Sequence, residues 1–281
     1  MGDNDVAALR ALTNSDLAAA RDELADGSAR PLLNAALRTY LASDGDGRVY
    51  DQPAAFTAFI RGGGNVGLYE AVSRALAARY AEVESLLDIG CGDGKALVPA
   101  LRGHRPAVTL VEPSRALLDA AVAALDGFAV TAHNTDAATF AESVEDRFDL
   151  AESTFALHAL PHEDRTTVLT ALCGHVSRLV IAEFDVPDHP PGSAEHLTFL
   201  AGTYEQGLAE YDKDRDLVAQ GFLMPVLTGQ LAPDARRSTW EQPATAWAAQ
   251  LTACGYTEVM IEPLYDYWSS PAFLLTARGT G

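Results

Sequence analysis

A glycine-rich stretch in the first half of the chain has the residue types of a cofactor site. The sequence "LLDIGCGDGKAL", residues 86–97, contains Gly90, Gly92 and Gly94 behind an apolar run, and Asp88 lies two residues ahead of the first glycine. Glycine permits positive φ angles and lets a ligand come close to the backbone. The stretch predicts a strand, a tight turn that receives a ligand, and then a helix.

A second acid lies where it could assist that turn. Glu112 follows the next apolar run, twenty-two residues after Gly90, and Pro113 comes directly after it. A carboxylate at the end of the second strand can accept both hydroxyl groups of a ribose. The two segments together predict a site for a nucleotide-type cofactor.

The glycine spacing distinguishes between classes of cofactor. Dinucleotide sites read G-x-G-x-x-G, whereas this chain reads G-x-G-x-G with an acid upstream. "LLDIGCGDG" followed by "VTLVEPS" resembles the first two motifs of the class I S-adenosylmethionine-dependent methyltransferases, and the resemblance extends more loosely over residues 61–281. It implies S-adenosyl-L-methionine as cofactor, with Asp88 receiving the ammonium group directly or through water.

The resemblance also implies further cofactor contacts. The family's adenine contact follows strand three, where Asp136 and Ala137 lie, although Asp136 is equally suited to cap a helix. Ser153 and Thr154, after strand four, are expected to face the cofactor. Arg61 matches an arginine that holds the cofactor carboxylate in some relatives, or it is a surface arginine.

Catalytic and acceptor residues are less clearly marked. His158, in "ESTFALHALPHED", could take a proton from an acceptor hydroxyl or amine, or it could be a packed loop histidine. Glu183, at the end of strand five, could orient an amine or lie in water. Six further residues are assigned to substrate binding, with core packing as the alternative for most of them: Tyr50, Tyr204, Tyr211, Met224, Trp240 and Tyr267.

Short apolar runs alternating with helical stretches must position these residues. The expected strands are "SLLDIG", "AVTLVE", "FAVTAH", "FDLAES", "RLVIAEF", "TEVMIEPL" and "AFLLTAR", the last two forming an antiparallel hairpin. The fold class is therefore α/β, a doubly wound, mostly parallel, seven-stranded Rossmann-like sheet. Residues 1–82 are predicted to form an N-terminal helical lid, 83–186 with 243–281 the core, and 187–242 a helical cap inserted after strand five.

Composition excludes several functions. The net charge is −19 and only two of the twenty basic residues are lysines, which disfavours nucleic-acid binding. No apolar run is long enough to span a membrane, and we expect a cytoplasmic monomer or homodimer. No metal site is predicted, because the acids of "DGDG" (residues 44–47) and the pair His158 and His162 lack metal-site spacing.

The resulting prediction is a methyltransferase acting on the oxygen, nitrogen or carbon of a small molecule. Three alternatives stay open: an enzyme on the same fold that cyclises or transfers the aminocarboxypropyl group of the cofactor, a protein that binds the cofactor without turnover, and an NAD-dependent oxidoreductase. The last of these would need the longer glycine spacing.

Overall fold

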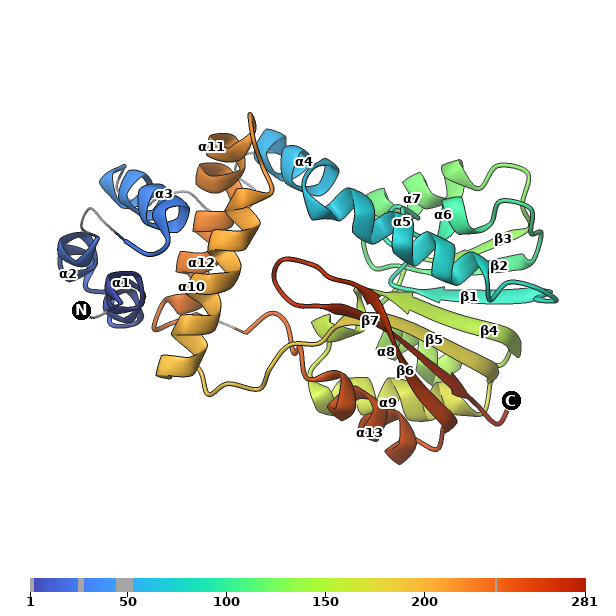
Figure 1. Cartoon of the computed structure of the whole chain (residues 1–281). Coiled ribbons are helices and arrows are strands. Elements are labelled where there is room, and N and C mark those ends of the chain that lie inside the picture. The colour runs from blue at the N-terminus through green and yellow to red at the C-terminus, as the bar shows by residue number, and fades with distance from the viewer. Residues whose placement is uncertain (1–2, 25–27, 44–52, 236) are drawn as a thin grey trace. The chain divides into compact units, whose positions relative to one another are not determined.

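A computed structural model describes residues 3–24, 28–43, 53–235 and 237–281 (Figure 1). The chain divides into two compact units. The helical unit comprises Met1–Val66, Asp188–Arg237 and Tyr267–Ser270. The sheet unit comprises Gly67–Pro187, Ser238–Asp266 and Pro271–Gly281.

The sheet unit contains one seven-stranded sheet in the order β3-β2-β1-β4-β5-β7-β6. Its strands are β1 (Ser85–Ile89), β2 (Ala107–Val111), β3 (Val130–His133), β4 (Phe148–Thr154), β5 (Val176–Phe184), β6 (Thr257–Tyr265) and β7 (Ala272–Arg278). The first five strands are mutually parallel, and β7 runs antiparallel to both β5 and β6. The predicted Rossmann-like fold, including the closing hairpin, is confirmed.

Helices cover both faces of this sheet. They are α5 (Gly64–Ala77), which begins in the helical unit, α6 (Leu97–Ala100), α7 (Arg115–Ala124), α8 (Ala137–Ser143), α9 (His162–Cys173), α13 (Ala244–Ala253) and the 3-10 turn η1 (Leu157–Ala159). Figure 1 shows α5, α6 and α7 over one face and α8, α9 and α13 over the other. The helix predicted after the glycine turn is short, because only Leu97–Ala100 is α-helical.

Burial explains why the central strands lack the alternation of an exposed sheet. Leu87, Ala151, Leu179 and Leu275 are at most 1% exposed and lie on the face covered by α9 and α13, where Trp247 is fully buried. Strands with helices on both faces are apolar nearly throughout. A charged residue inside such a strand is therefore informative about function.

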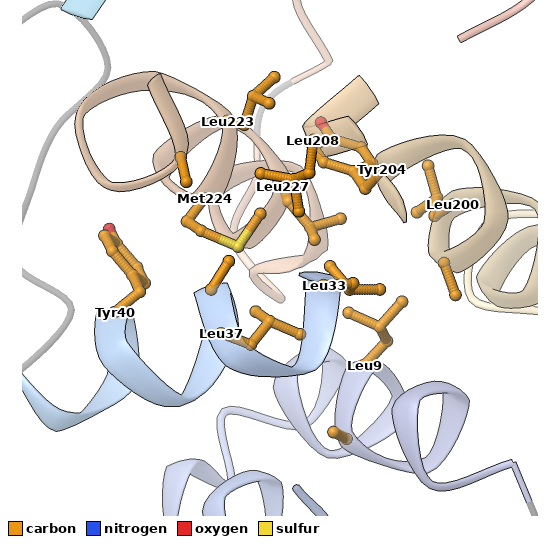
Figure 2. Packing of buried hydrophobic residues seen from close by; sticks show 14 of the residues in the cluster. Leu9, Leu33, Leu37, Tyr40, Leu200, Tyr204, Leu208, Leu223, Met224 and Leu227 are labelled. Carbon is orange, nitrogen blue, oxygen red and sulfur yellow. The ribbon is translucent and has the colours of Figure 1, made fainter. Parts of the chain in front are cut away.

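The helical unit is built from α1 (Asn4–Thr13), α2 (Leu17–Glu23), α3 (Pro31–Ala42), α4 (Pro53–Arg61), α10 (Ala194–Ala209), α11 (Arg215–Val218), a π-helical turn (Ala219–Leu223) and α12 (Met224–Leu231). Figure 2 shows its core, in which Leu33 and Leu37 of α3 meet Leu227 of α12. Leu9 of α1 and Leu200 of α10 belong to the same cluster. The N-terminal helices and the segment after β5 thus share one core.

Helices α1 and α2 are separate, because the chain turns at Ser15, whose φ is +56°, and the Asp16 side chain accepts a hydrogen bond from Ala19 N to start α2. The first segment of the helical unit ends at Val66, because most of α5 packs with the sheet unit; the division at residue 82 stays a prediction. In the described ranges, no helix is both long and apolar enough to cross a membrane.

Candidate active site

The glycine turn after β1 has the backbone that the sequence predicts. Gly90 and Gly92 have φ angles of +71° and +55°, in the left-handed region that glycine tolerates best. The two glycines differ in surroundings: a Cβ on Gly90 would lie 2.4 Å from the Cβ of Ala156, whereas a Cβ on Gly92 would meet no heavy atom within 4 Å. Gly90 therefore admits the chain after β4, and Gly92 faces open space in which a ligand could approach the backbone.

Glu112 is fixed against this turn by backbone donors. Its Oε2 accepts a hydrogen bond from Gly92 N at 3.1 Å, and its Oε1 accepts one from Ser114 N at 2.8 Å. Each carboxylate oxygen still has a second lone pair for a ligand hydroxyl. The next residue, Pro113, is exposed, and its carbonyl accepts a hydrogen bond from Asn134 Nδ2 at 2.9 Å.

Asp88 lies beside a carboxyl group that sequence reasoning overlooked. In the register of β1 and β4, Asp88 pairs with Glu152, and the two side chains are 4% and 1% exposed. Tyr80 donates a hydrogen bond from its hydroxyl to Glu152 Oε2 at 2.6 Å. Burial, with a contribution from Glu112, raises the pKa of Asp88 to about 7.

The pKa of Glu152 is also raised, first by burial and then by the charge of Asp88. A signal for Glu152 was present in the sequence. "FDLAEST" places an acid inside an apolar run that was expected to form a central strand, and an acid there must be buried.

The other residues assigned to cofactor binding in the sheet unit differ in exposure and in hydrogen bonding. Asp136 is exposed, and its Oδ1 accepts a hydrogen bond from Thr139 N at 2.8 Å, so it caps α8, which begins at Ala137. Ser153 is 1% exposed and donates its hydroxyl hydrogen to Ile89 O at 2.9 Å, which ties β4 to β1. Its contact with the cofactor stays a prediction. Thr154 ends β4 and is partly exposed.

Two further predicted site residues, Arg61 and Tyr50, do not belong to the sheet unit. Arg61 is the exposed last residue of α4, in the helical unit. The turn after it is packed in that unit, where Gly64 N donates to Glu210 Oε2 at 2.6 Å. Tyr50 lies outside the described residues.

The two predicted catalytic residues form a pair. His158 Nδ1 lies 2.8 Å from Glu183 Oε2, and the His158 backbone N–H donates to Glu183 Oε1 at 3.1 Å. Glu183 is 1% exposed, while the His158 side chain is 19% exposed. Burial lowers the pKa of His158, but the Glu183 carboxylate outweighs it and the net pKa is raised above the usual value. A carboxylate that holds Nδ1–H leaves Nε2 as the acceptor of a proton.

An aromatic group that sequence reasoning missed lies next to this pair. Phe155 has a φ of +50°, an uncommon conformation for a bulky residue. Its ring stacks on Phe184 at 4.5 Å and meets the edge of Tyr69 at 6.1 Å, and Lys95 Nζ lies 4.3 Å from the Tyr69 ring centre. These packing contacts surround the strained residue, which directly precedes Ala156, the neighbour of Gly90.

Most of the residues assigned to substrate binding belong to the core. Tyr204, Tyr211, Met224 and Tyr267 are at most 7% exposed inside the helical unit, and their assignment to substrate binding stays a prediction. Tyr204, Tyr211 and Met224 belong to the helical core cluster, and the Tyr267 hydroxyl donates a hydrogen bond to Asn65 Oδ1 at 3.1 Å. Trp240 differs, because it is partly exposed in the sheet unit and donates its backbone N–H to His158 O at 2.6 Å.

The exposed face of α10 forms a groove that sequence reasoning also missed. Its lining includes His189, Glu195, Thr198, Phe199, Gly202 and Gln206. The helical residues recur at intervals of three and four, and a Cβ on Gly202 would meet nothing within 4 Å. The described residues contain no group of three or more side chains suited to hold a metal ion.

Comparison with known proteins agrees with this geometry. Residues 86–178 match a family model described as a methyltransferase domain. No curated protein matches the chain by sequence.

Two solved structures show the same fold. Magnesium protoporphyrin IX methyltransferase of Synechocystis PCC 6803, with bound S-adenosylhomocysteine, is 14% identical with a TM-score of 0.54, over 86% of this chain and 98% of that one. The 1,6-didemethyltoxoflavin-N1-methyltransferase of Burkholderia thailandensis is 20% identical with a TM-score of 0.53, over 92% and 93% of the two chains. The matched segment contains the glycine turn, Glu112 and His158, so this part of the chain is similar to a methyltransferase domain, and the whole chain shares the fold of these methyltransferases.

Proposed function

We propose that the protein transfers the methyl group of S-adenosylmethionine to a small molecule, with His158 as general base. The observation that carries this proposal is the contact between Gly90 and Ala156. It brings the turn that would hold the cofactor against the segment that leads, two residues later, to His158. Cofactor and base would then share one edge of the sheet, where ligands of open α/β sheets bind.

The residues of the turn fit the proposed cofactor. Glu112 would accept the ribose hydroxyls, and the open side of Gly92 would admit the ligand to the backbone. Asp88, in its ionised form, would attract the ammonium group. Asp136 with Ala137, Thr154 and Arg61 stay proposed contacts. The two carboxylate oxygens of Asp136 also accept hydrogen bonds from the backbone N–H and the hydroxyl of Thr139.

S-adenosylmethionine supplies an electrophilic methyl group on a sulfonium. The protein aligns the acceptor, excludes water and removes a proton where the acceptor has one. The Glu183 carboxylate fixes the imidazole of His158 so that Nε2 is the basic atom. The rings of Tyr69 and Phe155 offer faces that attract a cation.

A small acceptor is favoured by charge and by the named substrates of the two structural neighbours, a porphyrin and a toxoflavin precursor. With a net charge of −19, the chain would repel polyanions. The α10 groove is our candidate surface for acceptor recognition in the helical unit. No arginine or lysine lines it, so an uncharged or cationic acceptor suits it better than an anionic one. Cytoplasmic location and a monomeric or homodimeric state stay predictions.

Calorimetry and product analysis test the proposal. The full chain should bind S-adenosylmethionine and S-adenosylhomocysteine, and Glu112→Ala should weaken both by about 1–3 kcal/mol through lost hydrogen bonds to a charged group. Incubation of cell extract with methyl-labelled cofactor should yield a labelled small molecule and S-adenosylhomocysteine. Methylthioadenosine as the product would instead indicate aminocarboxypropyl transfer. Absence of binding by folded protein would overturn the proposal.

A further inference from the structure

Arg165 of α9 is a fully buried cation whose contacts surround the His158 turn. Its side chain is 0% exposed and its guanidinium carbon lies 3.8 Å from the ring centre of Trp247. Nε donates to Gln250 Oε1 at 2.9 Å, and Nη1 donates to Trp240 O at 3.1 Å and more weakly to Leu157 O at 3.4 Å. Burying a guanidinium is costly unless it is well hydrogen-bonded, so this arrangement demands a reason.

The two carbonyl groups that Arg165 holds flank one residue. Leu157 directly precedes His158, and the N–H of Trp240 donates to His158 O at 2.6 Å. Glu183 holds the His158 N–H and Nδ1 from the other side. The backbone of His158 is therefore fixed at both its N–H and its C=O.

We propose that Arg165 is a positioning residue for His158: its guanidinium fork docks the Trp240 segment onto the η1 turn and places a positive charge beside the imidazole. A lysine could supply the charge but not the fork, because only arginine offers several donors in a fixed plane. The part of this proposal that concerns catalysis rests on the role of His158 as base, whereas its structural part does not.

The pKa of His158 is a quantity that the charge of Arg165 should change. The charged and titratable groups around His158 are Glu183 of β5, Glu241 of the segment before α13, Arg165 of α9 and His162 at the start of α9. The two carboxylates raise the pKa of His158, and Arg165 lowers it. Arg165 thereby keeps more of the imidazole neutral, in the form that accepts a proton.

The test is a titration of the histidine ring protons by NMR in the full chain, with the His158 signal assigned by its loss in His158→Gln. In Arg165→Gln the His158 pKa should rise, as expected for loss of a nearby like charge. Arg165→Lys should keep the pKa near the wild-type value but speed hydrogen exchange of the Trp240 amide, because the fork is lost. Arg79→Gln removes a cation paired with Glu262 elsewhere in the sheet unit and should change neither quantity.

A second variant keeps the proposal testable if Arg165→Gln does not fold. Gln250→Glu places a carboxylate against Arg165 Nε, which should raise the His158 pKa while the fork stays in place. An unchanged His158 pKa in this variant, or an unchanged Trp240 amide in Arg165→Lys, would overturn the proposal. Full activity of His158→Gln would refute the base role alone and leave the titration result standing, so the two failures are distinguishable.

Discussion

Alanine at Gly90 should mainly reduce the stability of the fold, whereas alanine at Gly92 should mainly weaken cofactor binding. Gly90→Ala and Gly92→Ala share the same costs for a left-handed φ, about 1–2 kcal/mol, and the same gain of about 0.4–1 kcal/mol from a stiffer unfolded chain. These contributions cancel when the two variants are compared. The difference between them reports the surroundings of the added methyl group.

The added methyl group at Gly90 meets a rigid neighbour. Its Cβ would lie 2.4 Å from the Cβ of Ala156, and neither atom can rotate away because both are fixed by the backbone. Overpacking of this kind costs about 1–3 kcal/mol, so Gly90→Ala should lose about 2–4 kcal/mol of unfolding free energy in all. Gly92→Ala has no such clash and should lose about 1 kcal/mol.

Gly92→Ala, the variant with the smaller loss of stability, should nevertheless weaken cofactor binding. The Gly92 methyl would occupy the open space proposed for the cofactor and should weaken S-adenosylmethionine binding at least about tenfold, or ~1.4 kcal/mol. Denaturant titration with an unchanged m-value measures the first effect, and calorimetry on folded protein measures the second. Equal stability losses in the two variants, or Gly92→Ala protein that binds as tightly as wild type, would refute the reasoning.

Three further predictions concern the buried carboxyl groups. Because burial raises the folded-state pKa of Asp88 to about 7, the folded state holds an extra proton in mildly acidic solution, and the unfolding free energy should fall as pH rises toward 7; Asp88→Asn should flatten this dependence in denaturant titrations. Tyr80→Phe removes the donor to Glu152 and should cost about 1–3 kcal/mol of unfolding free energy, with a matching loss in thermal melts. Glu183→Gln should lower the His158 pKa in an NMR titration, and a raised value would contradict the pairing.

Local patterns were sufficient to predict the sheet. The apolar runs identified all seven strands, and the glycine spacing with Glu112 located the turn, because both features depend on residues close together in the sequence. The sequence indicates His158 and Glu183 separately as candidate catalytic residues but does not predict their contact. Their contact joins positions twenty-five residues apart and depends on β4 and β5 being neighbours in the sheet.

Sequence alone does not separate the core positions of the helical unit from its exposed ones. Tyr204 and Met224 are assigned to substrate binding with core packing as the alternative, and the structure places both in the helical core. Which face of α10 is buried depends on α1 and α3, about 190 and 160 residues earlier in the chain. Sequence alone identified the helical character of this segment and could not identify its exposed face, where Phe199 and Gly202 lie.

The glycine motif has a structural role beyond ligand access. If Gly90 served only the cofactor, its neighbours would be open, as they are at Gly92. Instead it receives Ala156, which follows the strained Phe155 and precedes the η1 turn. A shift of the glycine turn should therefore move the segment that contains His158. A shift of η1 should change the hydrogen bond between Arg165 Nη1 and the Leu157 carbonyl. The glycine turn, the η1 segment with His158 and the buried guanidinium of Arg165 form one continuous chain of contacts, and a change in any one should alter the alignment of the other two.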